Sequence, residues 1–182
     1  MSDKYIIAHD MGTSSDKAVL VTVFGDIIDT AQRFYQTSHP APGYAEADPL
    51  DWWEAVCETT REVIKKTGVR ADDVVGMTFS SQSQCLLPVD RNGSPLRSAM
   101  TWLDGRSAEI IREILWTPPR VKGYNIFRVL EFLRITGGTP GQTGKDQIGK
   151  MLWLKRHQPE IFANTYKYLD AKDFIIYKLT GN

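Results

Sequence analysis

The stretch "IIAHDMGTSSDKAVLV" (residues 6–21) places a cluster of polar residues between two apolar segments. The apolar segments predict two β-strands, at residues 5–9 and 18–24, joined by a turn that contains Gly12. A third run, residues 27–36, alternates between apolar and polar side chains, as a half-buried strand does. We therefore expect the chain to begin with an antiparallel meander of three strands.

The turn between the first two strands combines groups that suit a phosphate. Gly12 leaves backbone N–H groups open to a ligand, and Thr13 and Ser14 add hydroxyl donors. Asp10 could hold Mg²⁺ directly or through water, and Lys17 could neutralise phosphate charge. The same residues also suit a polar hairpin in which Asp10 only caps turn amides. Spacing alone leaves both interpretations open.

Strands and helices alternate after the meander. Asp48 or Asp51 can cap a helix that ends at Gly68. Residues 74–79 and 85–89 are apolar enough for buried strands. Further helices are expected at residues 105–116, 127–135, 146–157 and 172–179. This order predicts a mixed α/β fold, with a mixed sheet, an N-terminal meander and flanking helices.

The composition excludes several classes of protein. The 182 residues are 42% hydrophobic, enough for one sizeable core, and the chain is too short for two large domains. Lysine plus arginine equals aspartate plus glutamate at 22 each, so no net field attracts nucleic acid or a membrane surface. No apolar run approaches the roughly 20 residues of a membrane-spanning helix. We expect neither nucleic acid nor a membrane as a partner.

The N-terminus and the cysteines indicate a cytoplasmic location. Residues 1–10 carry an acid and lead straight into a strand, so we do not expect a signal peptide. Cys57 and Cys85 lack the spacing of metal ligands and lie among apolar residues. They are typical of buried thiols in a reducing compartment.

The segment "SSQSQC" (residues 80–85) ends a predicted strand with amides and hydroxyls. Gln82, Ser83 and Gln84 are neutral hydrogen-bonding residues, which suit a polyol. Polar caps at the end of a strand are an equally good interpretation.

The segment "TWLDGRS" (residues 101–107) brings an aromatic residue, an acid and a base together. Asp104 could cap the next helix, with Arg106 as its ion-pair partner, and the residues alone favour that structural interpretation.

Other patterns of catalytic residues are absent from the sequence. The run "GTPGQTGKD" has Thr139 where a phosphate-binding P-loop needs glycine, and Asp146 where it needs serine or threonine. His9 lies beside Asp10 and could tune that acid, although one histidine on an apolar strand is more often a satisfied core residue. No Ser-His-Asp set or zinc spacing can be assembled.

Six motifs occur in order along the chain. They are Asp10-Met11-Gly12-Thr13 with Lys17, "PGYAEADPLDWW" (42–53), Ser80-Ser81-Gln82, "SPLRSAMTWLDGRS" (94–107), "KMLWLKRHQP" (150–159) and "KDFIIYKLTGN" (172–182). In this order and with these gaps, essentially all 182 residues resemble the N-terminal domain of the FGGY family of carbohydrate kinases. That family includes xylulokinase, gluconokinase and glycerol kinase.

The resemblance implies an actin-like ATPase fold of the ribonuclease H type. It also implies transfer of the γ-phosphoryl group of ATP to a sugar hydroxyl, in a cleft between two such domains. Asp10 would serve the Mg²⁺–phosphate region. The implied phosphate-binding residues are Gly12, Thr13, Ser14 and Lys17, and the implied sugar-binding residues are Gln82, Ser83, Gln84, Trp102, Asp104 and Arg106.

Two departures from the family pattern limit these implications. Xylulokinases usually carry Met-His where this chain has Ser83-Gln84, and glycerol kinases carry Arg-Glu, so the resemblance names no sugar beyond a ketose or polyol, with a xylulokinase-like reaction favoured. The family's catalytic base is an aspartate shortly after the LTG motif (residues 179–181), and the sequence here stops at Asn182.

We therefore expect residues 1–182 to be one domain. Its expected partners are a sugar, ATP, the missing C-terminal domain of the same kinase and a second copy of the chain in a homodimer. We expect the domain alone to be inactive. The alternatives are a non-catalytic sugar-binding module or a metal-dependent nuclease with Asp10 in a two-metal cluster.

Overall fold

The computed structural model describes residues 3–114, 116–138 and 141–181. The chain divides into two compact units, so the single core expected from its length is not what forms. The sheet unit comprises residues 1–37, 47–83 and 169–182, and the helical unit comprises residues 38–46 and 84–168.

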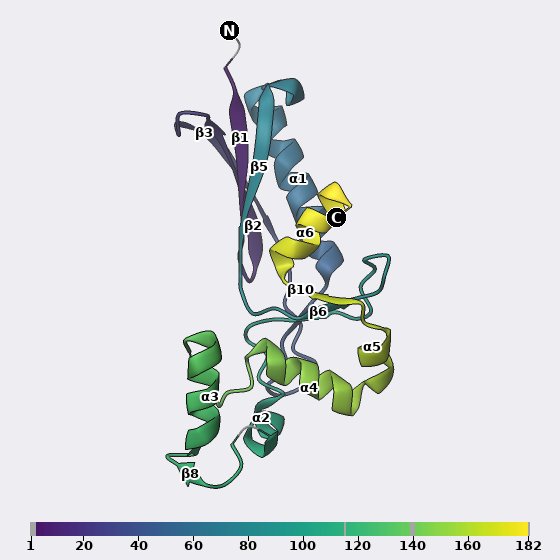
Figure 1. Ribbon diagram of the computed structural model, residues 1–182. Coiled ribbons are helices and arrows are strands. Elements are labelled where there is room, and N and C mark those ends of the chain that lie inside the picture. The colour runs from purple at the N-terminus through teal and green to yellow at the C-terminus, as the bar shows by residue number, and fades with distance from the viewer. Residues whose placement is uncertain (1–2, 115, 139–140, 182) are drawn as a thin grey trace. The chain divides into compact units, whose positions relative to one another are not determined.

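The sheet unit contains the expected meander. Strands β1 (Tyr5–Met11), β2 (Ser15–Thr22) and β3 (Ile27–Phe34) are antiparallel neighbours, and β5 (Val74–Ser81) runs parallel to β1 (Figure 1). The strand order is β3-β2-β1-β5. The sheet is therefore mixed, as the sequence predicts.

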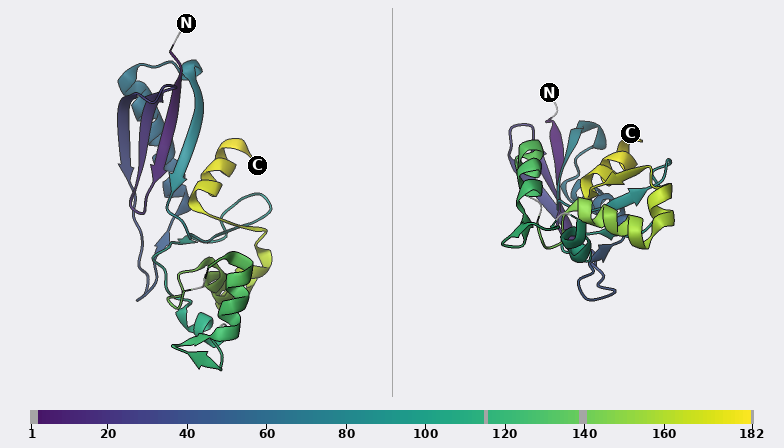
Figure 2. Two further views of the ribbon diagram at one scale, coloured as in Figure 1. Left: turned by 60° about the vertical axis from the view of Figure 1, so that its left-hand side comes forward. Right: turned by 60° about the horizontal axis from the view of Figure 1, so that its bottom comes forward.

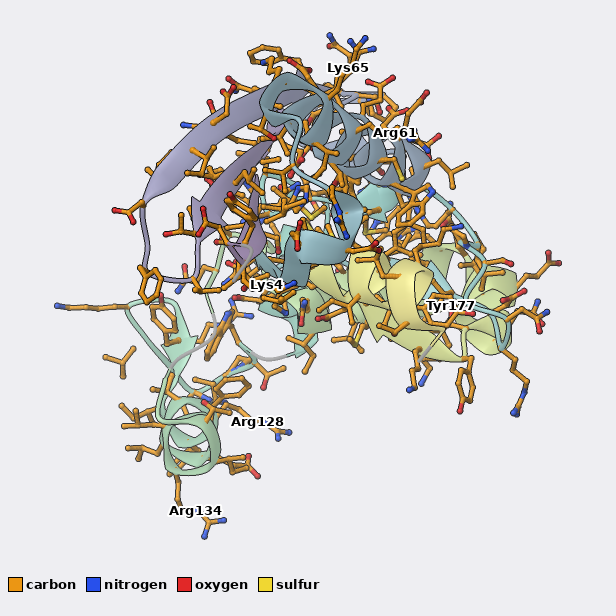
Figure 3. The ribbon with its side chains drawn as sticks, turned by 90° about the horizontal axis from the view of Figure 1, so that it is seen from above. Lys4, Arg61, Lys65, Arg128, Arg134 and Tyr177 are labelled. Atoms are coloured by element: carbon orange, nitrogen blue, oxygen red, sulfur yellow. The ribbon has the colours of Figure 1, made fainter. Side chains whose placement is uncertain are left out.

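Helix α1 (Pro49–Thr67) covers one face of this sheet (Figure 2). Asp48 caps its first turn by accepting from the Leu50 N–H, and Gly68 ends it in the left-handed conformation with φ 68°. Both predicted ends are thus confirmed. The buried stripe of α1 packs on the sheet, whereas Arg61 and Lys65 lie on its exposed side (Figure 3).

Strand β5 differs from the buried strand expected at residues 74–79. It extends to Ser81, and Val75 and Met77 are exposed, because β5 is an edge strand of the described sheet. The short 3₁₀ helix η1 (Ala71–Asp73) precedes it. Helix α6 (Ala171–Thr180) completes the unit beside α1, one residue longer at each end than predicted.

The helical unit is built from short elements. These are β6 (Leu87–Val89), β7 (Ala99–Met100), α2 (Ala108–Ile114), β8 (Arg120–Val121), β9 (Tyr124–Asn125), α3 (Ile126–Thr136), α4 (Gln147–His157), α5 (Pro159–Asn164) and β10 (Lys167–Leu169). Strand β4 (Glu46–Ala47) marks where the chain passes back to the sheet unit. The core of the helical unit contains Leu86, Met100, Ile110, Trp153 and Leu154.

The helix predicted at residues 105–116 begins three residues later, as α2, because a turn closed by the Ala108 N–H and the Gly105 carbonyl precedes it. Leu115, within the same prediction, lies outside the described residues. Helix α5 and the β8–β9 hairpin were not predicted, since each is too short to show a period. No helix in the described part of the chain is long and apolar enough to cross a membrane.

Both cysteines are free thiols. Cys85 is buried as expected, whereas Cys57 is only half-buried. Burial raises the pKa of the Cys57 thiol.

Candidate functional site

Residues that directly follow β3 form hydrogen bonds to the backbone carbonyl groups of the turn between β1 and β2. The Tyr35 hydroxyl lies 2.7 Å from the Gly12 carbonyl oxygen and 3.1 Å from that of Ser15, and the Tyr35 N–H donates to the Ser14 carbonyl at 3.0 Å. The Thr37 hydroxyl donates to the Thr13 carbonyl at 3.3 Å. We call residues 10–17 the phosphate turn, after the ligand that its residue types predict. Because the carbonyls of residues 12–15 all have hydrogen-bond partners at or after the end of β3, the backbone of the turn is held in one arrangement.

Asp10 and Lys17 lie directly opposite each other on β1 and β2, and both are exposed. Asp10 also lies opposite Ser80 on β5. Residues paired in register point to the same face of a sheet, which here is the face away from α1. The predicted acid, the predicted cation and a hydroxyl therefore share one open surface. Ser14 is exposed and Thr13 half-buried beside it. The Gly12 N–H, predicted to be open to a ligand, instead donates to the Ser15 carbonyl at 2.9 Å, because the two residues close the turn.

His9 and Asp16 point to the opposite face and form a buried network under α1. The His9 Nδ1 lies 2.9 Å from the Asp16 carboxylate, whose same oxygen lies 2.6 Å from the Thr59 hydroxyl. The His9 Nε2 lies 3.3 Å from the Thr60 hydroxyl, and its ring stacks on Phe79. His9 is thus the satisfied core residue that an apolar strand favours, on the face opposite to Asp10.

Gln82, Ser83 and Gln84 follow β5. The Gln82 N–H donates to the Met11 carbonyl at 2.8 Å, which continues the pairing with β1. The Nε2 and Oε1 atoms of the Gln82 side chain are buried, and neither has a hydrogen-bond partner within the described residues. Ser83 and Gln84 are exposed, and Gln84 has a left-handed backbone with φ 63°. A buried amide without a protein partner suits a ligand hydroxyl.

Trp102 belongs to the helical unit and remains accessible. Its side chain is 39% exposed, and the Lys145 Nζ lies 5.4 Å from the centre of its ring. An exposed aromatic face beside a cation is a surface on which the C–H face of a sugar can lie.

Asp104 and Arg106 are not exposed. The buried Asp104 carboxylate accepts from the Ala45 N–H at 2.8 Å and from Arg106, whose side chain is only 2% exposed. Arg106 also donates to Glu46 at 2.6 Å, and its guanidinium lies 3.7 Å from the centre of the Tyr44 ring. The predicted ion pair is thus present, whereas Asp104 does not cap the next helix, because α2 begins only at Ala108. Both side chains are used within the helical unit.

Burial and the neighbouring carboxylates shift the pKa values of Arg106 and Arg97. Burial alone would lower the pKa of Arg106, but the hydrogen-bonded carboxylates of Asp104 and Glu46 outweigh it and raise the pKa. Arg97 also contacts Glu46, yet burial dominates there and lowers the pKa of Arg97. Sequence reasoning missed Glu46 and Arg97, although both lie inside motifs that carried the resemblance.

The two hollows described next, and the acidic residues elsewhere in the described ranges, give no alternative candidate site. A hollow of about 240 Å³ in the sheet unit is lined by residues 33–36 and by α1, and one of about 550 Å³ in the helical unit by residues 90–96 and 163–166. Neither contains a predicted site residue. In the described ranges no group of three or more histidines, cysteines or acids is arranged to hold a metal ion, so a two-metal nuclease centre has no support there. Thr139, which breaks the P-loop pattern, lies outside the described residues.

Comparison with known proteins gives one consistent result. Residues 5–182 match the model of the FGGY family of carbohydrate kinases, N-terminal domain. The xylulose kinase of Staphylococcus xylosus is 34% identical over 180 residues, which are 98% of this chain and 34% of that protein. The xylulose kinase of Bacillus subtilis (strain 168) is 32% identical over 98% of this chain and 33% of its own length.

Solved structures give the same result for the fold. The gluconate kinase from Lactobacillus acidophilus superimposes with a TM-score of 0.84 and 28% identity, over 100% of this chain and 34% of that one. The ligand-bound xylulose kinase from Lactobacillus acidophilus has a TM-score of 0.83 and 28% identity, over 98% of this chain and 34% of its own. The chain thus spans about a third of the length of the relatives that it matches.

Proposed function

Because the chain belongs to the FGGY family of carbohydrate kinases, we propose that it is the sugar-binding N-terminal domain of an ATP-dependent sugar kinase about three times its length. The remaining two thirds of this complete kinase supply the adenine site and the catalytic base. ATP as the phosphoryl donor favours a cytoplasmic location. The observation that carries the proposal is the open face on which Asp10 and Lys17 meet beside the phosphate turn.

The phosphate turn serves the donor. The hydroxyls of Thr13 and Ser14 donate to phosphate oxygens, and the Lys17 ammonium neutralises part of their charge. Asp10 is a lone exposed carboxylate, which fits Mg²⁺ because this ion is commonly held by one or two carboxylates together with substrate phosphates and water. Bound there, Mg²⁺ supplies charge neutralisation for the transferred group. The turn backbone, held by Tyr35, needs no reorganisation when the phosphates arrive.

The acceptor side consists of the amides and hydroxyl of Gln82, Ser83 and Gln84 together with the ring of Trp102. Amide groups both donate to and accept from sugar hydroxyls, and the buried amide of Gln82 fixes orientation. The relatives named xylulose kinase favour a ketose or polyol substrate. Asp104 and Arg106 support the segment that carries Trp102, and their hydrogen bonds to each other leave them outside the proposed set of sugar contacts.

A coupled assay tests this function. The complete kinase, offered a panel of pentuloses, hexuloses and polyols with Mg-ATP, should turn over ATP in a sugar-dependent manner. The 182-residue chain alone should bind the same sugar in a calorimeter without turnover, since it lacks the base. Robust turnover by the chain alone contradicts the assignment of the base to the remaining part. A complete kinase that is inactive on the whole panel contradicts the function itself.

A further inference from the structure

Lys150 is a fully buried lysine on α4 whose ammonium joins two distant segments of the helical unit. Its Nζ donates to the Gln84 carbonyl at 2.7 Å and to the Thr101 carbonyl at 2.8 Å. Removing an ammonium from water is costly unless it is well hydrogen-bonded. These two carbonyls therefore bind the buried ammonium, and it in turn fixes the distance between them.

The two carbonyls belong to the segments proposed to contact the sugar. Gln84 is itself a proposed sugar-binding residue, and its φ of 63° is uncommon for a residue other than glycine. Thr101 directly precedes Trp102, and its own N–H donates to the Ala45 carbonyl. Loss of the ammonium would free Gln84 to relax toward an ordinary backbone conformation and would release the chain before Trp102.

Close packing of α4 fixes the position from which the Lys150 side chain extends. A Cβ on Gly149 would lie 2.4 Å from the Ser107 Oγ and 2.9 Å from the Ile111 Cγ1, so α4 approaches this segment as closely as only glycine allows. Ser107 also donates to the Gly144 carbonyl at 2.6 Å. From the same helix, the Gln147 amide donates to the Cys85 carbonyl at 2.9 Å. Two side chains of one rigid helix thus hold residues 84 and 85.

We propose that Lys150 is a positioning residue for sugar binding, which holds Gln84 and Trp102 in the arrangement that accepts the substrate. The inference rests on the proposed function, because it takes these two residues to be sugar contacts. Lys150 acts through them and touches neither the sugar nor the phosphates.

The test uses Lys150→Met, which keeps the length and volume of the side chain and removes its donors. Lys155→Met is the matched control, since Lys155 is an exposed lysine on the same helix. D-xylulose is titrated into the 182-residue chain by calorimetry and by tryptophan fluorescence, with Trp102→Phe identifying the signal of Trp102. We expect K150M to raise the dissociation constant at least about tenfold and to abolish the Trp102 response, and K155M to stay within about twofold. An unchanged dissociation constant in a folded K150M overturns the proposal.

A second variant separates positioning from general loss of structure. In a Gln84→Gly background, glycine adopts positive φ without strain, so the effect of K150M on the dissociation constant should fall to about threefold or less. An equal effect in both backgrounds overturns positioning through Gln84. In the complete kinase, K150M should raise KM for the sugar and leave KM for ATP unchanged. A rise in both constants would contradict a role confined to the sugar.

Backbone hydrogen exchange separates failure of the inference from failure of the proposed function. The amides of Leu86 and Thr101 are hydrogen-bonded beside the two carbonyls. Their exchange should be faster in K150M than in K155M without any sugar present. If the complete kinase is inactive on every sugar of the panel, the proposed function is wrong, and the role of Lys150 in sugar binding is wrong with it. Equal exchange in the two variants overturns the inference about Lys150 even when sugar binds.

Discussion

The phosphate turn and the segment of residues 101–107 each carry an acid and a base in a short motif, yet the structure uses the two pairs in opposite ways. Asp10 and Lys17 are exposed across neighbouring strands. Asp104 and Arg106 are buried and hydrogen-bonded to each other. An acid and a base close together in sequence therefore indicate a site only when the fold leaves them accessible.

The physical difference lies in the elements that carry the pairs. Side chains alternate along a strand, so Asp10 falls on the open face while His9 falls under α1. Asp104 lies in a tight turn, where its carboxylate reaches the Arg106 N–H and guanidinium at once. Substitutions in the first pair should change catalysis, and substitutions in the second should change stability.

The largest expected effect comes from breaking the buried ion pair of Asp104 and Arg106. Arg106→Met leaves the Asp104 carboxylate buried without its cation and leaves Glu46 paired with Arg97 alone, so it should lower the free energy of unfolding by about 3–5 kcal/mol. Urea unfolding followed by circular dichroism measures it. Arg156→Met is the matched control, because it removes a half-exposed ion pair with Glu113 and should cost about 1 kcal/mol or less. Equal losses in the two variants would remove the contrast between the two regions.

Trp102→Ala sharpens the comparison through its effect on sugar binding. Loss of the exposed ring should raise the dissociation constant of the sugar about tenfold, because stacking area is lost. The free energy of unfolding should fall by only about 1–2 kcal/mol, since Trp102 is 39% exposed and only the rest of its ring is buried. Calorimetry with Trp102→Phe beside it measures the change, and phenylalanine should keep most of the affinity. Full affinity in the alanine variant would place the sugar elsewhere.

Some features of the fold and of the candidate site could be predicted from local sequence, and others could not. The meander and both ends of α1 follow from side-chain alternation and from Asp48 and Gly68. The exposure of Val75 could not, because alternation does not tell which strand forms the edge of a sheet. The partners of Arg106 could not either, since Glu46 is far from it in sequence.

Tyr35 was missed for a similar reason, and its substitution has the smallest expected effect. Tyr35→Phe removes the hydroxyl that lies against the Gly12 and Ser15 carbonyls, so the phosphate turn should loosen. We expect the free energy of unfolding to fall by about 1 kcal/mol and KM for ATP in the complete kinase to rise about threefold to tenfold. The exposed Tyr166, changed to Phe, is the control. An unaltered KM for ATP would show that the hydroxyl does not support nucleotide binding.

The most direct test of the phosphate turn is the sugar-dependent ATP turnover of the complete kinase with Asp10→Asn. The account predicts that kcat falls about 100-fold or more, with the sugar dissociation constant and the free energy of unfolding unchanged, because an exposed carboxylate that serves Mg²⁺ and phosphate is lost. Turnover close to that of the unmodified kinase would contradict the assignment of this turn to the donor.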